Sequence, residues 1–236
     1  MLSIQEALGS NSYPGRGILI GRNEEGNSTY VVYFIMGRSE NSRNRIFSKT
    51  EDGIRTEAFD PSKMVDPSLI IYHPVRSYEG ELVVTNGDQT DTIRDSLAAG
   101  KCFRHALMSR EFEPDGPNYT PRISGIVHKD GSIALSILKS ADGDPACCCR
   151  YFYEYDHPKA GMGYLIHTYQ GDGAPLPSFK GEPTVVEVAG GIKAYTEAVW
   201  QALNEDNKVS IYGLADRKST RLNSSHPTTS RMPSSA

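Results

Sequence analysis

The sequence predicts an α+β fold, namely a four-layer αββα sandwich with two mainly antiparallel sheets between layers of helices. Runs of β-branched and aromatic residues recur in both halves of the chain, whereas helical spacing of apolar residues is confined to the middle and to the region before the last strand. The strand runs are apolar on both faces, so each sheet needs a second sheet on one face and helices on the other. A generic α+β domain is the alternative.

The length and composition are those of one domain with a sizeable core. The chain has 236 residues, of which 38% are hydrophobic and 23% are charged, and we expect a single domain over residues 1–215. The net charge of -4 provides no broad basic surface for nucleic acid, and no apolar run is long enough to cross a membrane. Residues 1–6 lack the features of a secretory signal, so we expect a cytoplasmic protein.

The first half of the chain is predicted to form strands joined by turns. Residues 17–21 and 29–36 are rich in strand-forming side chains, and Glu24-Glu25-Gly26-Asn27 between them is typical of a hairpin. Further strands are predicted at Ile46–Lys49, Arg55–Phe59, Leu69–Tyr72 and Glu81–Thr85.

The last of these strands runs into Asn86-Gly87 and then into a polar cluster that opens a helix. Gly87 permits backbone conformations that a Cβ atom would penalise, and Asp88, Thr90 or Asp91 could cap the helix. The free N–H groups of the helix start could bind an anion or a polar heterocycle. An ordinary capped turn is the alternative.

Two helices, a loop and a second antiparallel sheet are predicted to follow. The helical spacing runs from Ile93 to Met108 and is divided at Gly100, and the prolines between Arg110 and Arg122 predict a loop. The second sheet is predicted from strands at Ile123–Val127, Ile133–Leu138, Arg150–Tyr155 and Tyr164–Tyr169. A strand at Val185–Val188, a helix from Ile192 to Leu203 that contains Trp200, and a strand at Val209–Tyr212 complete the expected elements.

Two further regions are informative about class rather than fold. The tail over residues 216–236 is Ser/Thr-rich and nearly devoid of large apolar residues, so we expect it to be disordered or artefactual. The triplet Cys147-Cys148-Cys149 cannot converge on one tetrahedral ion, because consecutive strand residues point to opposite faces. We therefore expect no metal site, and cysteines that serve as small buried apolar side chains.

Several segments together resemble the archaeal-type IMP cyclohydrolase family and its bacterial relatives, over roughly residues 10–190. They are Tyr13–Gly17, Gly37–Ser39 with Asn41–Arg45, Asp66–Tyr72, Thr85–Ile93, Arg110–Glu113 with Asn118–Arg122, and His167–Gly173. The resemblance implies the αββα fold of N-terminal-nucleophile hydrolases. It also implies a hydrolase acting on cyclic amidines, which closes 5-formamidoimidazole-4-carboxamide ribotide to IMP with loss of water in purine biosynthesis, without a metal or cofactor.

The resemblance also implies site residues, by motif. The catalytic candidates are Arg45, Tyr72, Glu111 and Glu113, and Asn86 is a candidate for substrate binding. Apart from the motif match, guanidinium groups and the N–H groups of a helix start suit a phosphate or a base, which adds Arg38, Gly87, Thr90, Asp91 and Arg122 as candidates for substrate binding. Ring closure must remove a proton from a carboxamide, stabilise an oxyanion and protonate a departing hydroxyl, and a carboxylate, a phenol and a guanidinium suit these needs. His167 is a further contact candidate. Each of these residues also has an ordinary structural interpretation as a surface charge or a buried strand side chain.

The expected partner is a small-molecule purine ribonucleotide, with no nucleic acid and no membrane, and self-association stays open. Two other functions are consistent with the same residues. One is a related amidohydrolase or cyclohydrolase acting on another substrate, and the other is a non-catalytic nucleotide-binding module.

Overall fold

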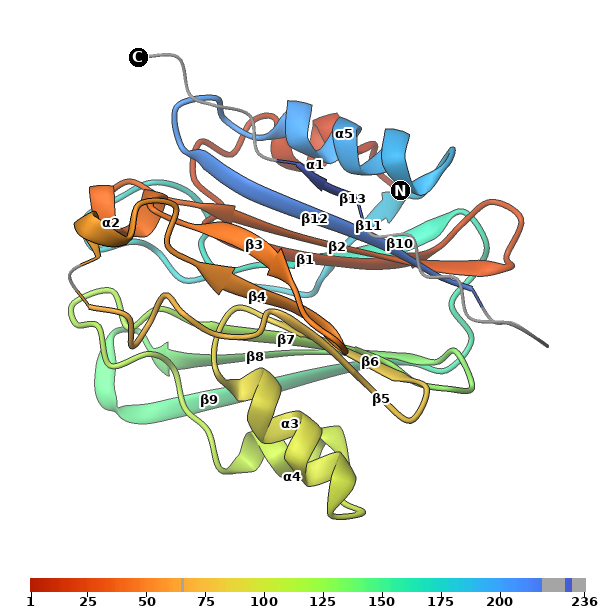
Figure 1. The fold of residues 1–236 in the computed structure, drawn as a ribbon, viewed down its shortest axis with the longest axis horizontal. Coiled ribbons are helices and arrows are strands. Elements are labelled where there is room, and N and C mark those ends of the chain that lie inside the picture. Colours follow the sequence, from red (N-terminus) through yellow and green to blue (C-terminus); the bar gives the residue numbers. More distant parts are fainter. Residues whose placement is uncertain (65, 218–227, 231–236) are drawn as a thin grey trace.

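Two antiparallel sheets pack face to face, and helices lie on the outer face of each (Figure 1). The computed structural model describes residues 1–64, 66–217 and 228–230. The chain is therefore an α+β protein with two antiparallel sheets, as the sequence predicts. Among the described residues, no helix is long and apolar enough to span a membrane.

The first sheet has six strands, which come from both ends of the chain. In spatial order they are β11 (Thr184–Glu187), β10 (Met162–His167), β1 (Arg16–Arg22), β2 (Ser28–Met36), β12 (Lys208–Arg217) and β13 (Thr228–Ser230). Helices α1 (Ile4–Leu8) and α5 (Ile192–Ala202) cover its outer face, where Leu8 and Trp200 pack on Leu19 and Phe34. The hairpin between β1 and β2 and the helix containing Trp200 are as predicted.

The second sheet has seven strands that follow one another in sequence order. They are β3 (Ile46–Lys49), β4 (Gly53–Glu57), β5 (Val75–Tyr78), β6 (Glu81–Thr85), β7 (Arg122–Val127), β8 (Ile133–Ala141) and β9 (Asp144–Tyr155). Helices α3 (Gln89–Ala98) and α4 (Phe103–Met108) cover its outer face through Ile93 and Leu107. Gly100, at a φ of 71°, separates the two helices as predicted.

Alternation of side chains along the strands explains why both faces are apolar. In β1, Ile18 and Ile20 point between the sheets, where they meet Ile123 and Leu135 of the other sheet. Leu19 points the other way, toward the covering helices. All of these side chains are fully buried, so apolar burial on both faces holds the layers together.

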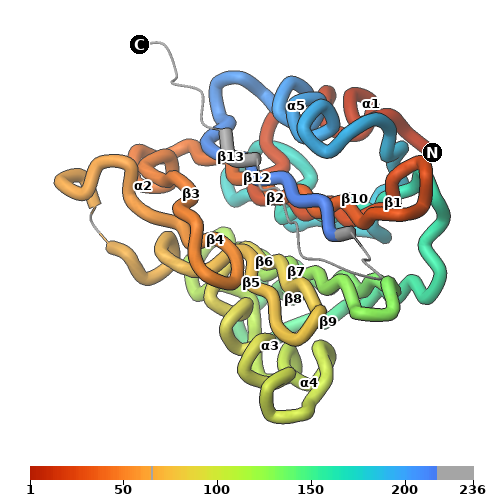
Figure 2. The backbone as a smooth tube through the Cα atoms, turned by 45° about the vertical axis from the view of Figure 1, so that its right-hand side comes forward, coloured from red at the N-terminus to blue at the C-terminus, as the bar shows by residue number. Residues whose placement is uncertain are grey.

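The predicted division of strands between the sheets is wrong. We expected the second sheet to contain the strand near Tyr164, but β10 pairs with β1 in the first sheet, with Ile18 opposite Ile166. Figure 2 shows β10 in one layer with β1 and β2, apart from β7, β8 and β9. A Cβ atom on Gly21 would lie 2.5 Å from the Cα of Gly163, so two strands far apart in sequence approach closely only because glycine occupies both positions.

The predicted strand at Leu69–Tyr72 is also wrong, because residues 68–70 form a turn and the missed strand is β5. The chain between β4 and β5 contains a short 3₁₀ helix at Pro61–Lys63. Thr56 holds the end of the turn, since the N–H of Tyr72 donates to Thr56 Oγ1 at 2.9 Å and the N–H of Thr56 donates to the Tyr72 carbonyl at 2.9 Å.

The cysteines are not buried as expected, because Cys147, Cys148 and Cys149 lie on the edge strand β9 and Cys102 lies at the exposed start of α4. Cys102 and Cys147 are exposed, and Cys148 and Cys149 are partly exposed.

The C-terminal strand extends into the expected tail. Strand β12 runs to Arg217, two residues into the tail, and β13 pairs with it. The remaining residues of the expected tail lie outside the described residues.

Candidate functional site

Arg45 is a fully buried arginine whose guanidinium has unused donors. It follows the short helix α2 (Glu40–Arg43), whose start is held by reciprocal hydrogen bonds between Ser39 and Ser42. The Arg45 Nε donates to the Ser42 carbonyl at 2.9 Å, whereas Nη1 and Nη2 have no hydrogen-bond partner among the described residues. Burial lowers the pKa of Arg45, and the neighbouring Arg16 lowers it further. Such a group is arranged to bind an oxygen ligand.

Tyr72 contributes a buried phenol from the segment that leads into β5. Its backbone is held by Thr56, and its hydroxyl lies 2.7 Å from the hydroxyl of Tyr33, which projects from the middle of β2. Tyr33 is fully buried, and burial raises its pKa well above the ordinary value. The sequence placed Tyr33 in a strand but offered no signal that its hydroxyl would meet another phenol.

The loop after α4 separates the two glutamates that the sequence could not rank. The Glu113 side chain is buried, and its backbone N–H donates to the Thr120 carbonyl at 2.9 Å. Glu111 is exposed and lies 3.8 Å from Arg150. Burial raises the pKa of Glu113 despite the opposing influence of Arg16. Of the two, Glu113 is the carboxylate placed among the other buried site candidates.

Arg16 is a charged residue that was not among the predicted site residues. It begins β1, within the segment Tyr13–Gly17 that was noted for its family resemblance. Its Nε is buried and has no hydrogen-bond partner among the described residues. Although burial opposes it, the Glu113 carboxylate raises the pKa of Arg16, with a smaller contribution from Tyr169.

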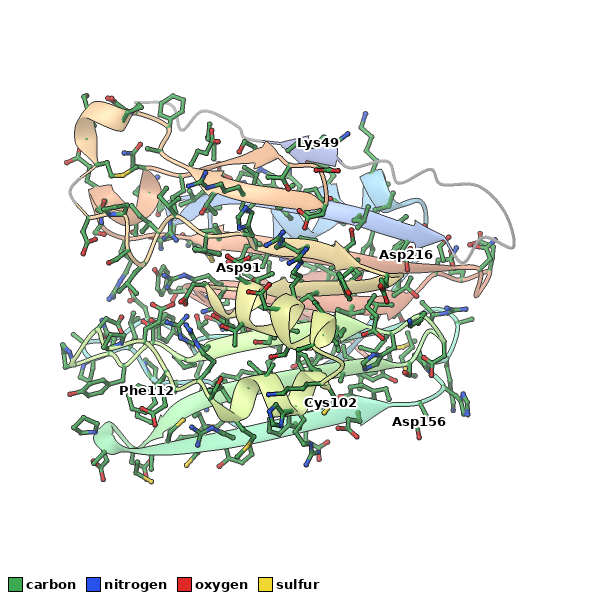
Figure 3. All side chains as sticks on the ribbon, turned by 60° about the horizontal axis from the view of Figure 1, so that its bottom comes forward. Lys49, Asp91, Cys102, Phe112, Asp156 and Asp216 are labelled. Atoms are coloured by element: carbon green, nitrogen blue, oxygen red, sulfur yellow. The ribbon has the colours of Figure 1, made fainter. Side chains whose placement is uncertain are left out.

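The half-buried Arg16 and the buried Tyr33, Arg45, Tyr72 and Glu113 are together called the buried cluster below. Its members interact electrostatically, although they come from two strands of the first sheet and from three connecting segments. Figure 3 places Phe112, the neighbour of Glu113, toward one end of the molecule, with Asp156 and Asp216 toward the other. The cluster combines two cations, one carboxylate and two phenols, which can stabilise a developing oxyanion and transfer a proton.

The Asn86 turn is built differently from the expectation. Asn86 Oδ1 accepts hydrogen bonds from the Ile123 N–H at 2.9 Å and from Gln89 Nε2 at 3.0 Å, and Nδ2 donates to the Pro121 carbonyl at 2.9 Å. These contacts tie the end of β6 to the start of β7. The side chain of Asn86 is therefore committed to the protein itself.

Gly87 and Asp88 are also used for close packing. Gly87 does not have a positive φ, but a Cβ atom there would lie 2.5 Å from Arg122 Nη1. Asp88 precedes α3 without forming the expected side-chain cap, and its carboxylate pairs with Arg110 and, at 2.8 Å, with Arg122. The predicted capping by Asp88 is wrong, because two arginines compete for the carboxylate.

The remaining candidates pair with other protein groups. Thr90 is buried and lies 2.6 Å from the Thr85 hydroxyl, and Asp91 pairs with Arg76 at 3.0 Å. Arg38 is partly exposed, pairs with Asp172 and lies over the Tyr13 ring. None of these three is among the charged groups that shift the pKa values of the buried cluster.

His167 is a buried neutral histidine at the end of β10. Its Nδ1 lies 2.8 Å from the Tyr169 carbonyl, to which it donates, and its ring packs edge-on against Phe179. Burial lowers the pKa of His167 to about 4. Its position supports a structural role more directly than a contact with a ligand.

A cavity of about 810 Å³ opens between the β8–β9 hairpin and the segment after β10. Its lining includes Lys139 and Tyr151 from the hairpin and Asn118 and Gln170 from loops, but no member of the buried cluster. Gln170 follows Tyr169, whose hydroxyl lies 2.5 Å from that of Thr120. The cavity has a volume typical of small-molecule sites, but neither hydroxyl of this pair belongs to its lining.

In the part of the chain that the structure describes, no group of three or more His, Cys, Asp or Glu side chains could hold a metal ion. The expectation that no metal is used thus stays a prediction from the sequence.

The chain is similar in sequence to proteins of one family. The family described as "IMP cyclohydrolase-like protein" matches residues 13–220. The IMP cyclohydrolase of Methanopyrus kandleri is 33% identical over 174 residues, which are 70% of this chain and 79% of that protein. The IMP cyclohydrolase of Methanocaldococcus jannaschii is 27% identical over 195 residues, which are 78% of this chain and 88% of that protein. The family match spans all of the buried cluster.

Proposed function

The chain belongs to the IMP cyclohydrolase-like protein family, and we propose that it is an IMP cyclohydrolase whose active site is the buried cluster. Its substrate would be 5-formamidoimidazole-4-carboxamide ribotide, a purine ribonucleotide precursor. The reaction forms a bond between the carboxamide nitrogen and the formyl carbon. The formyl oxygen leaves as water, with one proton from the carboxamide nitrogen and one from the formamide nitrogen.

The observation that carries this proposal is the pair of unused Nη donors on Arg45 beside the phenol of Tyr72. A buried guanidinium with two unpaired nitrogens costs stability, so its presence is accounted for by a ligand that supplies the missing acceptors. The formyl oxygen is such an acceptor, and it gains negative charge when the carboxamide attacks. Donors that are already in place stabilise this charge without reorganisation.

Glu113 is the group that we propose to move the protons. Burial raises its pKa, which makes a carboxylate a better base toward a weakly acidic amide. The same carboxyl group, once protonated, can return the proton to the departing hydroxyl. Arg16 beside it favours the ionised form before each turnover.

Three further expectations, on fold kinship, domain extent and location, are also proposals. The order of helix and sheet layers supports kinship with the fold of N-terminal-nucleophile hydrolases. We also propose that residues 1–215 act as one domain, and that the protein works in the cytoplasm on a small-molecule substrate.

The test is a ring-closure assay on the purified chain with the formylated ribotide. Arg45→Lys keeps the charge but loses the planar fork, and we expect kcat to fall about a hundredfold. Arg43→Lys is the matched control, because Arg43 lies two residues away and its guanidinium donates to the Gly37 and Asp206 carbonyls. We expect Arg43→Lys to retain wild-type kcat.

Two outcomes would contradict the proposal. Full activity of Arg45→Lys would remove Arg45 from the site. Tight binding of IMP by the wild-type chain without any turnover of the ribotide would indicate a nucleotide-binding module instead.

A further inference from the structure

The Tyr33 and Tyr72 hydroxyls form a hydrogen-bonded pair inside the protein. They are 2.7 Å apart, and no other hydrogen bond to either hydroxyl is made by the described residues. The Tyr33 ring is fixed, because it packs on Phe47 with centroids 5.9 Å apart and lies opposite Tyr212 in the β2–β12 register. The Tyr72 backbone is fixed by Thr56. Both ends of the pair are therefore held in place.

A count of protons shows that this pair has one donor left over. Two phenols carry two hydroxyl protons, and one proton lies between the two oxygens. The charged neighbours Arg16 and Arg45 cannot accept the second proton, because a guanidinium has donors only. The leftover O–H therefore needs an acceptor that a ligand can supply.

Exposure indicates which tyrosine keeps the free proton. Tyr33 is 0% exposed and Tyr72 is 4% exposed, so Tyr72 is the member nearer to incoming molecules. The arrangement that leaves no buried donor unpaired is Tyr33 donating to Tyr72, with the Tyr72 proton directed toward the substrate.

We propose that Tyr33 is a positioning residue that donates to the Tyr72 hydroxyl and thereby directs the Tyr72 proton toward the formyl oxygen of the substrate. This rests on the proposed function. The chain from Tyr33 through Tyr72 to the substrate oxygen strengthens as that oxygen becomes negative, since a hydrogen bond accepted by a phenol polarises the one that it donates. Tyr33 therefore contributes to the transition state more than to ground-state binding.

The test is a double-mutant cycle with Tyr33→Phe, Tyr72→Phe and the double variant. We expect Tyr33→Phe to lower kcat about tenfold, with KM nearly unchanged. In the Tyr72→Phe background, the same substitution should have almost no further effect, because Tyr33 acts through Tyr72. Equal losses in both backgrounds, or a change in KM alone, would overturn the proposal.

The matched control is Tyr212→Phe. Tyr212 is buried, pairs with Tyr33 across the strands and packs on the same Phe47 ring, so it reports the cost of removing a hydroxyl from this part of the core. We expect wild-type kcat for Tyr212→Phe. A similar loss of kcat in both single variants would show that Tyr33 acts only through core packing.

The direction of the hydrogen bond can be read without activity. In the ligand-free protein with isotope-labelled tyrosine, we expect the Tyr33 hydroxyl proton to give a slowly exchanging NMR signal that disappears in Tyr72→Phe. A slowly exchanging Tyr72 proton in its place would reverse the direction and overturn the proposal. If the wild-type chain fails to close the ring, the proposed function fails, while this measurement still decides the direction of donation.

Discussion

The Oδ1 atom of Asp88 lies 2.8 Å from Nη1 of Arg122 and joins the start of α3 to the start of β7. Arg122 also donates to Gln89 Oε1 at 2.7 Å. Burial opposes ionisation of Asp88, but Arg110 and Arg122 hold the pKa of this carboxyl below its ordinary value. The turn is therefore a charged junction between two elements, and this determines how its residues respond to substitution.

Gly87→Ala should disturb this junction. The added Cβ would lie 2.5 Å from Arg122 Nη1, so Arg122 must move away from Asp88 and Gln89. We expect a loss of about 1–3 kcal/mol in the free energy of unfolding, measured by chemical denaturation. The control is Gly171→Ala, whose nearest neighbour would lie 3.9 Å away, and equal stability of the two variants would contradict the prediction.

Asn86→Ala should act on stability before it acts on substrate binding. The substitution leaves the Ile123 N–H, the Gln89 amide and the Pro121 carbonyl without their buried partner. We expect a loss of about 2–4 kcal/mol in the free energy of unfolding. If the variant instead has wild-type stability and a raised KM, Asn86 contacts the substrate.

Glu113→Gln should make the protein more stable at neutral pH while it lowers activity. Burial raises the folded-state pKa of Glu113 above its ordinary value of 4.5, so wild-type stability is highest below that value and falls as the pH rises through the raised pKa. The variant has no such loss. We therefore expect Glu113→Gln to have a higher free energy of unfolding than wild type at pH 7, measured by chemical denaturation. The difference between the two proteins should vanish below pH 4.5.

The same glutamate should shape the pH profile of the reaction. If Glu113 is the base, wild-type kcat/KM falls as the pH decreases through the raised pKa of its carboxyl group. A wild-type acid limb that persists unchanged in the residual activity of Glu113→Gln would exclude this carboxylate as the base.

His167 should destabilise the protein in acid. Burial lowers its folded-state pKa from 6.5 to about 4, so its contribution to stability is present above pH 6.5 and is lost as the pH falls toward 4. The loss amounts to at most about 3.5 kcal/mol, from about 1.4 kcal/mol per pKa unit. His167→Asn keeps a donor for the Tyr169 carbonyl and should lose less stability in acid than wild type. Chemical denaturation of both proteins between pH 7 and 4.5 checks this. Equal acid sensitivity of the two proteins would contradict the prediction.

Local features of the sequence were sufficient for much of the fold. Strand runs that are apolar on both faces correctly predicted two antiparallel sheets. Gly100 correctly predicted the break between two helices, because it adopts a positive φ. An ordered set of short motifs was sufficient for the family. These properties depend on side chains that are close together in the chain, or on motifs that can be compared directly.

Partners and burial could be determined only from the tertiary structure. Strand β10 joined β1 because Gly21 and Gly163 permit close approach, and neither residue indicates its partner locally. Glu113 differs from Glu111 by burial, and Tyr33 differs from other strand tyrosines by its contact with Tyr72. The sequence by itself determined the layers and the family, whereas the packing of distant segments decided the buried cluster, because hydrogen-bond partners and desolvation arise only where those segments meet.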